Sequence, residues 1–441
     1  MQKEFSNISG FYTMPITQRR QQLKTLLGLT DKDLEGLGPL DAPQLAIADK
    51  MVENVVGTFD LPVGIATNFR INDRDYLIPM ATEEPSVVAA ASNSAKVARE
   101  AGGFVTETTE PIMIGQIQVV KVPDIAAAMR KVSDSKVELL AKANEVDPIL
   151  VKNRGGAKNI DVRVLPTSMG DMLIIHLLVD CRDAMGANSI NTMCETLAPE
   201  IERLTGGQVL LRILSNLAKF RLARAKATFP AKALVTEDLT GEQVVERILL
   251  AQVFAESDPF RCATHNKGIM NGVEAVVRAT GNDTRAVEAG AHAYAAFEGC
   301  YAPLTKYDTD ANGDLVGSIE LPMPVGLVGG ATAVHPCAKA CVKMLGVKTA
   351  SELAGIIAAV GLAQNFGALR AMVTAGIQKG HMRLHARNLA VTAGATPEML
   401  DEVVRRMVDG GKVRMDIAVK IIEELRRGKN GPASGKDRKA R

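Results

Sequence analysis

The spacing of apolar and polar positions in the first hundred residues predicts helices, then a strand pair, then one longer helix. Residues 15–58 are expected to form helices separated by short turns. Two half-buried strands should follow, from Gly64 to Phe69 and from Arg74 to Pro79. Pro85 suits the first turn of an alanine-rich helix, which Gly102-Gly103 should end.

The pattern changes between residues 109 and 216, where strands and helices alternate. The expected order is strand, helix, strand, strand, helix and strand, which matches the split β-α-β, ferredoxin-like arrangement. Such a unit usually makes a compact domain of this size, and helical composition resumes after about residue 220, so we interpret it as an inserted smaller domain. Its expected elements are Ile112 to Val122, Pro123 to about Glu145, Asp161 to Leu165, Met172 to Asp180, Asp183 to Leu204 and Gln208 to Leu214.

The sequence from 240 to 300 is mostly helical in pattern, and Asp283 is a good N-cap for one of its helices. A hairpin is expected next, with strands from Lys306 to Asp308 and from Leu315 to Leu321. Three short helices should follow Gly376. Further helices are expected near residues 337–345, 349–361 and 363–375.

These elements predict an α+β protein with a helix-rich large domain, an inserted ferredoxin-like domain and a small mobile C-terminal helical flap. A chain of 441 residues is too long for one ordinary core, which supports several domains. The expected boundaries are 1–108 and 220–375 for the large domain, 109–219 for the insert, 376–428 for the flap and 429–441 for a disordered basic tail.

Composition and charge narrow the class of protein. A hydrophobic share of 46% with no Trp fits a soluble chain, and 52 Lys and Arg against 50 Asp and Glu give no global field for nucleic acid. The six cysteines lack Cys-x-x-Cys spacing, as expected of reduced cytosolic thiols. The least polar run, Leu321 to Val334, is shorter than a membrane span and is broken by prolines and glycines. We expect a cytoplasmic protein that binds neither nucleic acid nor membrane.

Lys267 is the first candidate for chemistry, because it stands in a run from Thr264 to Gly272 that has no other cation. Lysine is normally kept in water. One among glycines, amides and apolar residues therefore indicates a desolvated ammonium that pairs with a carboxylate, such as Asp283, and stabilises a developing oxyanion. A lysine in a surface loop is the alternative that the residues leave open.

The segment from Asp180 to Asn188 follows an apolar strand and opens a helix. Free backbone amides at a helix start, flanked by small residues, suit a diphosphate. Neither a G-x-G-x-x-G fingerprint nor a Walker A sequence occurs, so a nucleotide would need a different scaffold. An ordinary N-capped helix is the alternative.

Carboxylates and histidines supply candidates for proton transfer. Glu83 or Glu84 would act as a general acid if burial raised its pKa against the opposing helix dipole, and charge–dipole pairing is the alternative. His381 and His385 are four residues apart on one helical face, but no third zinc ligand accompanies them, so no metal is expected. One histidine near a hinge, delivering a proton when a mobile segment closes, fits better.

Seven short segments stand in order along the chain: Glu53-Asn54-Val55-Val56-Gly57, Glu84-Pro85-Ser86, Asp183-Ala184-Met185-Gly186-Ala187-Asn188, Thr264-His265-Asn266-Lys267-Gly268 to Gly272, Gly281-Asn282-Asp283, Pro324-Val325-Gly326-Leu327-Val328-Gly329-Gly330 and Gly380-His381. Together they resemble class II 3-hydroxy-3-methylglutaryl-coenzyme A (HMG-CoA) reductase, the bacterial form. The resemblance extends from about residue 20 to residue 428.

The resemblance implies an oxidoreductase that interconverts HMG-CoA with mevalonate and coenzyme A (CoA) through two hydride transfers with a nicotinamide cofactor. Lys267 would polarise the thioester and aldehyde oxygens, and Asp283 would hold that ammonium. Glu84 would exchange protons with the lysine and the substrate oxygen. His381, on the mobile C-terminal segment, would protonate the departing CoA thiolate.

The resemblance also assigns binding positions and an oligomer. Asp147 would lie against the adenosine ribose, where a carboxylate repels a 2′-phosphate, so NAD(H) is favoured over NADP(H). A homodimer with active sites at the subunit interface is implied, with higher oligomers left open. The substrate would contact Ser86, Arg261, Asn271, Gln364 and His385, and the cofactor would contact Asp183, Ala184, Met185, Gly186, Ala187, Asn188 and Asn216.

Two other functions are kept as alternatives. A non-catalytic CoA- or nucleotide-binding protein of the same fold would not require the proton-transfer set of Glu84, Lys267, Asp283 and His381. Covalent acyl transfer by Cys262, with His265 nearby, predicts that Cys262→Ala abolishes activity, yet no residue in the sequence activates that thiol. The chain also departs from the family near its start, because Phe11-Tyr12-Thr13 lacks an arginine that contacts CoA in a related enzyme.

Overall fold

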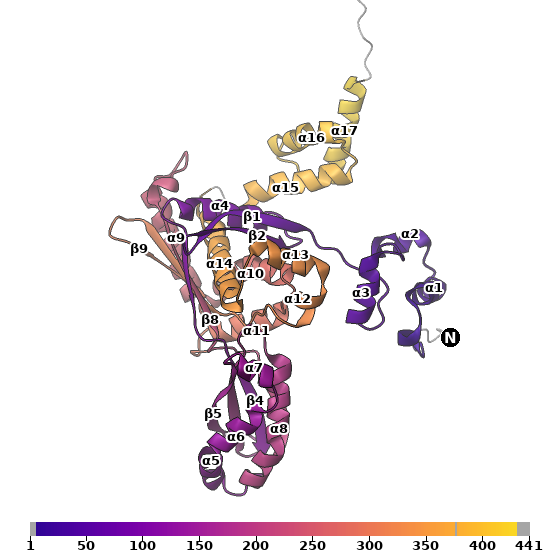
Figure 1. Ribbon diagram of the computed structural model, residues 1–441. Coiled ribbons are helices and arrows are strands. Elements are labelled where there is room, and N and C mark those ends of the chain that lie inside the picture. The colour runs from indigo at the N-terminus through magenta and orange to yellow at the C-terminus, as the bar shows by residue number, and fades with distance from the viewer. Residues whose placement is uncertain (1–5, 375–376, 430–441) are drawn as a thin grey trace, which may run out of the picture. The chain divides into compact units, whose positions relative to one another are not determined.

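The computed structural model describes residues 6–374 and 377–429, and the chain divides into two compact units, Met1–Pro62 and Val63–Arg441 (Figure 1). The predicted basic tail lies outside the described residues, except for Lys429, which ends the last helix. Its disorder therefore stays a prediction.

The first unit is helical, as predicted, and two buried arginines hold it together. Arg19 and Arg20 are 5% and 8% exposed, and their guanidinium groups donate to backbone carbonyls rather than pack in an apolar core. Arg19 Nη1 lies 2.9 Å from the Val55 oxygen, and Arg20 Nε lies 2.6 Å from the Val56 oxygen. The helices of this unit are α1 (Ile16–Leu27), α2 (Asp31–Leu34) and α3 (Pro43–Met51).

The second unit contains a six-stranded sheet of order β2-β1-β3-β8-β10-β9. The two predicted strand pairs are confirmed, because β1 pairs with β2 and β9 pairs with β10, both antiparallel. The two central strands between these pairs, β3 and β8, were not predicted. The strands are β1 (Val63–Ile71), β2 (Arg74–Ala81), β3 (Phe104–Thr108), β8 (Leu222–Phe229), β9 (Thr305–Thr309) and β10 (Leu315–Pro322).

The composition of β8 explains why it was missed. Ala223, Ala225 and Ala227 alternate along it and are all buried, yet alanine favours helices when it is read locally. The strand packs directly against α14 (Ala350–Val373), and small side chains permit this close approach. Tertiary packing therefore outweighs local propensity at this strand.

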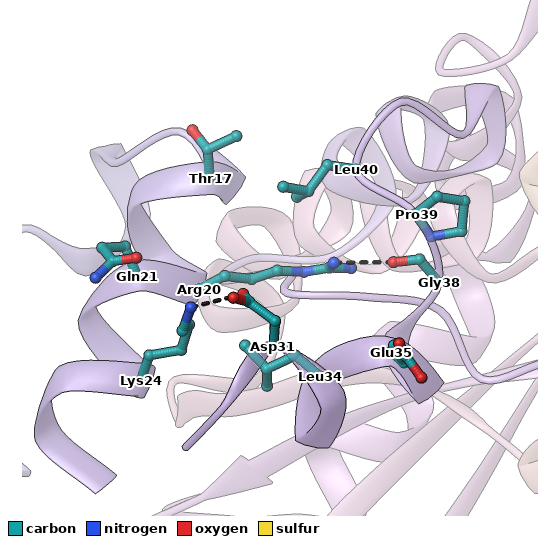
Figure 2. Close-up of a pocket in the computed structure, with 10 residues that line it drawn as sticks. All are labelled: Thr17, Arg20, Gln21, Lys24, Asp31, Leu34, Glu35, Gly38, Pro39 and Leu40. Atoms are coloured by element: carbon teal, nitrogen blue, oxygen red, sulfur yellow. Dashed lines mark hydrogen bonds and ion pairs between the residues drawn. The ribbon is translucent and has the colours of Figure 1, made fainter. Parts of the chain in front are cut away.

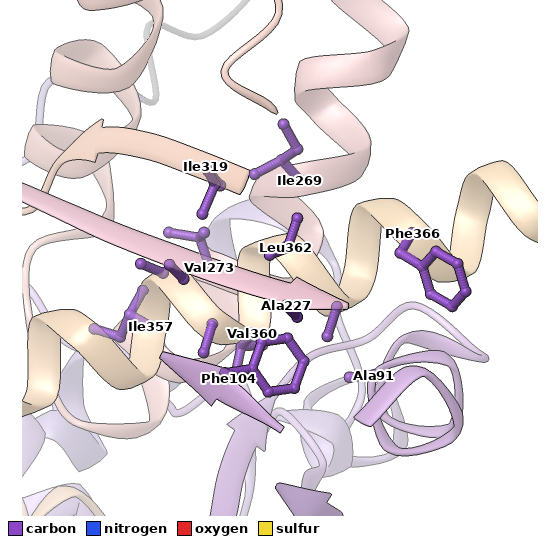
Figure 3. Packing of buried hydrophobic residues seen from close by; sticks show 14 of the residues in the cluster. Ala91, Phe104, Ala227, Ile269, Val273, Ile319, Ile357, Val360, Leu362 and Phe366 are labelled. Atoms are coloured by element: carbon purple, nitrogen blue, oxygen red, sulfur yellow. The ribbon is translucent and has the colours of Figure 1, made fainter. Parts of the chain in front are cut away.

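Helix α14 runs through the core of the second unit (Figure 3). The prediction of two helices here, near 349–361 and 363–375, is wrong, because one continuous helix is buried on nearly every side. Its length and composition would allow it to cross a membrane, but 67% of its most apolar 18-residue segment is buried inside the protein. Phe366 on this helix stacks on Phe229 with ring centroids 3.7 Å apart. These features identify a core helix.

A second long helix, α10 (Pro259–Ala279), packs beside α14. A Cβ atom on Gly272 would stand 2.8 Å from the Cβ of Gln364, so a glycine at this position lets the two helices approach closely. The remaining helices of this region are α4 (Val87–Arg99), α9 (Gly241–Ser257), α11 (Thr284–Ala295), α12 (Gly330–Val334) and α13 (Pro336–Leu345).

A second sheet has four antiparallel strands in the order β5-β6-β4-β7 and its own hydrophobic core. The element order agrees with the predicted β-α-β-β-α-β pattern, but the single helix predicted from Pro123 to Glu145 is wrong, because the chain breaks at Ser135 and adds a third short helix. The elements are β4 (Ile112–Val120), α5 (Ile125–Asp134), α6 (Lys136–Asn144), α7 (Pro148–Lys152), β5 (Gly156–Leu165), β6 (Met172–Asp180), α8 (Ala187–Thr205) and β7 (Gln208–Ser215).

Three helices follow residue 376, as predicted: α15 (Ile377–Thr392), α16 (Pro397–Asp409) and α17 (Met415–Lys429). They enclose a small apolar cluster of their own, which includes Val403, Met407 and Ala418. This segment therefore packs as a unit, and its predicted mobility stays a prediction.

Candidate functional site

Lys267 and Glu84 line one cavity of about 370 Å³, termed the lysine cavity. Its walls come from the turn before α4, from the first half of α10 and from the second half of α14. Four of the five residues predicted to bind substrate lie in it, together with several that were not singled out. The wall includes Glu84, Ser86, Arg261, Thr264, His265, Lys267, Asn271, Gln364, Asn365 and Met372.

Lys267 lies in the middle of α10 rather than in a loop. Its Nζ lies 2.8 Å from Oε2 of Glu84, and Asn271, one turn further along, donates from Nδ2 to Oε1 at 3.3 Å. Both carboxylate oxygens of Glu84 are thus held by one face of α10. The Lys267 side chain is 60% exposed, so the expected desolvation is not found in the single chain.

The turn that carries Glu84 has an unusual backbone at Ser86, where φ is 74°. A serine at positive φ costs conformational energy, and such strain is retained where surrounding structure requires it, often at functional sites. Ser86 is the N-cap residue of α4, but its side chain caps no backbone N–H. The Ser86 hydroxyl therefore makes no helix-capping hydrogen bond, and Ser86 lies on the wall of the lysine cavity.

Arg261 is a half-buried cation without a carboxylate partner among the described residues. It lies in the first turn of α10, where its backbone N–H is capped by Asp258 at 3.1 Å. Its guanidinium contacts Met372 Sδ at 3.9 Å, and burial lowers the pKa of Arg261. A guanidinium that lines a cavity and lacks an anion is suited to bind a carboxylate or phosphate.

His265 and Gln364 are buried on the wall of the same cavity, and each has a polar atom without a partner. These atoms are Nδ1 of His265 and Oε1 of Gln364. Burial, and then the charge of Arg261, lowers the pKa of His265 to about 4, so this imidazole is neutral near pH 7. From the sequence, His265 was considered as a neighbour of Cys262 and as part of the Thr264 to Gly272 motif, but no role was predicted for it. Its spacing of four residues from Arg261 on one helix is the signal that would have found it.

A second cavity of about 600 Å³, termed the glycine-rich cavity, joins three of the predicted motifs. A Cβ atom on Gly186, where φ is 101°, would stand 2.2 Å from Cys181 Sγ, and one on Gly326 would stand 2.7 Å from the Met185 nitrogen. Glycine is thus required where these loops approach each other. The lining includes Ala184, Met185, Gly186, Ala187, Asn188, Ser189, Gly281, Asn282, Asp283, Arg285, Gly326, Gly329 and Gly330.

Two charged side chains stabilise the loops around the glycine-rich cavity through hydrogen bonds to the backbone. Arg221 is 5% exposed and donates to the carbonyls of Ala184, at 2.9 Å, and Val325, at 2.6 Å. Asp183 Oδ1 accepts from the Ala350 N–H at 2.7 Å. The carboxylate of Asp183 is therefore already hydrogen-bonded within the protein. Asp183 does not line the glycine-rich cavity, whereas the five residues that follow it do.

Asp283 does not meet Lys267 within the chain. Its Oδ1 accepts from the Ala286 N–H at 3.0 Å, which confirms the predicted N-cap, and it lines the glycine-rich cavity instead of the lysine cavity. Along α10, Lys267 and Ala279 are separated by about 18 Å, from the 1.5 Å rise per residue. The expected pairing of Lys267 with Asp283 is therefore not made in a single copy.

The other predicted site residues lie outside both cavities. Asp147 caps α7 through the Leu150 N–H at 2.9 Å and accepts from Ser189 Oγ at 2.8 Å, and Ser189 lines the glycine-rich cavity. Asn216 is exposed. His385 is exposed on α15, and the side chain of His381 lies outside the described ones.

A third cavity of about 420 Å³ lies in the first unit (Figure 2). Two cations line it, but both are already engaged: Arg20 donates to the Gly38 carbonyl at 2.8 Å, and Lys24 pairs with Asp31 at 2.6 Å. Neither is available to a phosphate without breaking these contacts. The two cations of this cavity therefore do not substitute for the CoA-contacting arginine that is absent near Phe11-Tyr12-Thr13.

The thiol of Cys262 is poorly suited to nucleophilic catalysis. Cys262 is fully buried, and burial raises the pKa of this thiol to about 11. A thiolate, rather than a thiol, is the nucleophile in cysteine enzymes. Its environment therefore disfavours the acyl-transfer alternative.

Comparison with known proteins agrees with the motifs. The family model described as hydroxymethylglutaryl-coenzyme A reductase matches residues 15–386. The chain is 58% identical over 421 residues to the HMG-CoA reductase of Archaeoglobus fulgidus, which covers 96% of this chain and 95% of that protein. It is 25% identical over 409 residues to the HMG-CoA reductase of Pyrococcus abyssi, with coverage of 86% and 94%.

The same class of protein is found among solved structures. The class II HMG-CoA reductase of Streptococcus pneumoniae, bound to NADPH in open conformations, is similar with a TM-score of 0.74 and 41% identity, over 93% of this chain and 99% of that one. The α+β fold and these comparisons thus define an oxidoreductase. The chain belongs to the hydroxymethylglutaryl-coenzyme A reductase family. The predicted resemblance to the class II enzymes is confirmed.

Proposed function

We propose that this protein reduces HMG-CoA to mevalonate and CoA in two steps, or runs the reverse oxidation, with a nicotinamide cofactor. The observation that carries the proposal is the Lys267–Glu84 ion pair in a cavity that also holds the unpaired Arg261. HMG-CoA has a free carboxylate at one end of its acyl group and a thioester at the other. The lysine cavity therefore offers one cation for each end.

The nicotinamide supplies hydride when it is bound, and the residues of the chain manage the charge and the protons. Lys267 would stabilise the oxyanion that forms when hydride reaches the thioester carbon, and one such donor is typically worth about 3 kcal/mol. His381 would protonate the CoA thiolate as it leaves. Glu84, held by Lys267 and Asn271, would return a proton to the alkoxide after the second hydride reaches the aldehyde.

The glycine-rich cavity is our candidate for the dinucleotide. Gly186 is the N-cap residue of α8, a 19-residue helix, and the free N–H groups of a helix start favour a diphosphate. The close approach of backbone at Gly186 and Gly326 fits a ligand held mainly by main-chain groups. On this proposal residues 109–219 are a ferredoxin-like cofactor domain inserted between 1–108 and 220–375, and the 376–428 flap brings His381 to the site.

The choice of cofactor rests on Asp147. Its carboxylate is bonded to Ser189, which lines the glycine-rich cavity, so negative charge stands close to the ligand and would oppose a 2′-phosphate. We therefore propose NAD(H) in preference to NADP(H). The pneumococcal relative is bound to NADPH, so cofactor preference needs a direct measurement in this protein.

A homodimer would resolve the separation of Lys267 and Asp283. If the glycine-rich cavity of one copy faced the lysine cavity of a second copy, the partner's Asp283 would approach Lys267. The same contact would remove Lys267, 60% exposed in the single chain, from water. A lysine shielded in this way would stabilise an oxyanion more strongly, because electrostatic interactions strengthen as water is excluded.

A spectrophotometric assay of the purified chain in both directions tests the proposal. HMG-CoA should cause oxidation of NADH, and mevalonate with CoA should cause reduction of NAD⁺, with NADP(H) a poorer cofactor. A protein that binds CoA but turns over in neither direction with either cofactor would be the non-catalytic alternative. A higher kcat/KM with NADPH than with NADH would refute only the role of Asp147.

A further inference from the structure

One face of α10 carries a row of polar side chains that extends well beyond the lysine cavity. Its four members follow one another at intervals of four, three and four residues, which places them on the same side of the helix: Lys267, Asn271, Glu274 and Arg278. The first two hold the carboxylate of Glu84. The last two do not line the lysine cavity, and the proposed mechanism gives them no role.

Two consecutive carboxylates are paired with cations at the two ends of this row. Glu84 Oε2 lies 2.8 Å from Lys267 Nζ, and Glu83 Oε2 lies 3.5 Å from Arg278 Nη1. The two cations are about three helical turns apart, so the two side chains of the turn extend in opposite directions along α10. The turn ends at Ser86, where φ is 74°, and a strained turn keeps its shape only where surrounding contacts require it. The two ion pairs supply such contacts on both sides.

Arg278 is itself held by a more buried group. Its Nη2 bonds to Glu274, whose side chain is 17% exposed. Burial, and then a hydrogen bond with Glu288, raises the pKa of Glu274 to about 7, so Glu274 is mostly neutral below pH 7. Glu288 has its own partner, because Nε2 of His292 lies 2.8 Å from it. The positive charge of Arg278 therefore remains available to Glu83.

We propose that Arg278 is a positioning residue: it holds and neutralises Glu83, so that Glu84 alone pairs with Lys267. The inference rests on the proposed function and deepens it by separating the roles of two adjacent carboxylates. Glu84 lines the lysine cavity and Glu83 does not, which agrees with this division. Without Arg278, the charge of Glu83 would repel Glu84 and compete with it for Lys267, which is 60% exposed and free to move.

A double-mutant cycle tests whether Arg278 acts through Glu83. Arg278→Gln leaves Glu83 without its cation, so kcat should fall by about fivefold while KM for HMG-CoA stays nearly unchanged. This loss corresponds to about 1 kcal/mol, the upper end for an exposed ion pair. Arg278→Lys keeps the charge and should recover most of the loss. The double variant Glu83→Gln/Arg278→Gln should also recover, because no unneutralised carboxylate then remains beside Glu84.

Arg99→Gln is the matched control and should keep parental kcat. Arg99 and Asp75 form a pair of similar exposure, at 40% and 67%, against 35% and 65% for Arg278 and Glu83. Parental kcat in Arg278→Gln would overturn the inference, and so would equal losses in the single and double variants, since these indicate a purely structural role. If Arg278→Gln does not fold, Glu83→Lys sets a cation against Arg278 without removing the arginine, and parental kcat in that variant would also overturn the inference. A parent enzyme without turnover would instead refute the proposed function.

Discussion

Lys267 and Glu84 are 183 residues apart in the sequence, yet their charged groups lie 2.8 Å apart. The pair contributes little to stability, because both side chains are partly exposed, at 60% and 36%, and exposed ion pairs are worth at most about 1 kcal/mol. Its position in a cavity beside Arg261, which has no carboxylate partner among the described residues, supports the functional role that we propose for it.

Lys267→Ala should therefore abolish activity without unfolding the protein. Loss of one preorganised donor to an oxyanion typically lowers kcat by about 10²–10³-fold. Tm should change little, since the lysine side chain is mostly in water. Lys306→Ala, at an exposed position of β9 that does not line the lysine cavity, is the matched control and should keep parental kcat. A Lys267→Ala variant with more than about a tenth of parental kcat would contradict the proposed oxyanion role.

Local patterns in the sequence predicted the parts of the site that depend on one segment. The Asp283 cap is set by residues a few positions away and is found, and the helix expected from Asp183 is also present, although it begins at Ala187. The strand β8 was missed because its alternating alanines are explained only by α14, more than a hundred residues away. The distance between Lys267 and Asp283 could not be predicted either, because it depends on how far α10 continues beyond Lys267, which is to Ala279.

Cys262→Ala should leave kcat within about twofold of the parent. The thiol is fully buried with its pKa raised to about 11, so almost no thiolate exists at pH 7. Steady-state assays at saturating HMG-CoA would measure this. Loss of all activity in a variant that keeps its Tm would instead support covalent acyl transfer.

The side chains of Glu274 and His292 should make stability fall as pH rises. Burial, and then a hydrogen bond with Glu288, raises the pKa of Glu274 from 4.5 to about 7, and the bond with Glu288 raises the pKa of His292. Both groups bind protons more tightly in the folded state. Their contribution is thus complete below the unfolded pKa values and is lost as pH rises through the folded ones.

Glu274→Gln isolates one of these contributions, because glutamine cannot titrate. The Tm of the parent relative to this variant should fall by a few °C between about pH 5 and pH 8, which scanning calorimetry would detect. Glu288 acts in the opposite sense, since its hydrogen bond with His292 lowers its pKa, but that contribution is lost only below this range. A constant Tm difference across the range would show that Glu274 titrates normally.

Arg221→Lys should weaken cofactor binding more than substrate binding. The planar guanidinium donates to the carbonyls of Ala184 and Val325 at once, and an ammonium on a flexible stem would not reproduce that geometry. KM for the cofactor should rise several-fold with KM for HMG-CoA nearly unchanged. Arg224→Lys is the control, because Arg224 lies three residues further along, on β8, and is paired with Glu107 at a partly exposed position. Equal effects of the two substitutions on cofactor KM would argue that the hydrogen bonds of Arg221 to Ala184 and Val325 have no role in cofactor binding.

Mixed dimers can decide whether Asp283 acts on Lys267 of its own chain or of a second copy. Lys267→Ala and Asp283→Asn should each be nearly inactive as homodimers. If each site takes Lys267 from one chain and the partner's Asp283 from the other, a hybrid of the two variants has one site with both native residues and one site with neither. Random pairing makes about half of all dimers hybrid, so co-expressed variants should recover about a quarter of parental activity. Differently tagged chains, purified by both tags, would raise this to about half.

If both residues belonged to one chain, each site of the hybrid would lack one of them, and activity would stay at the level of the separate variants. The distance along α10 favours recovery, since about 18 Å separates Lys267 from Ala279, the last residue of the helix, within a single copy.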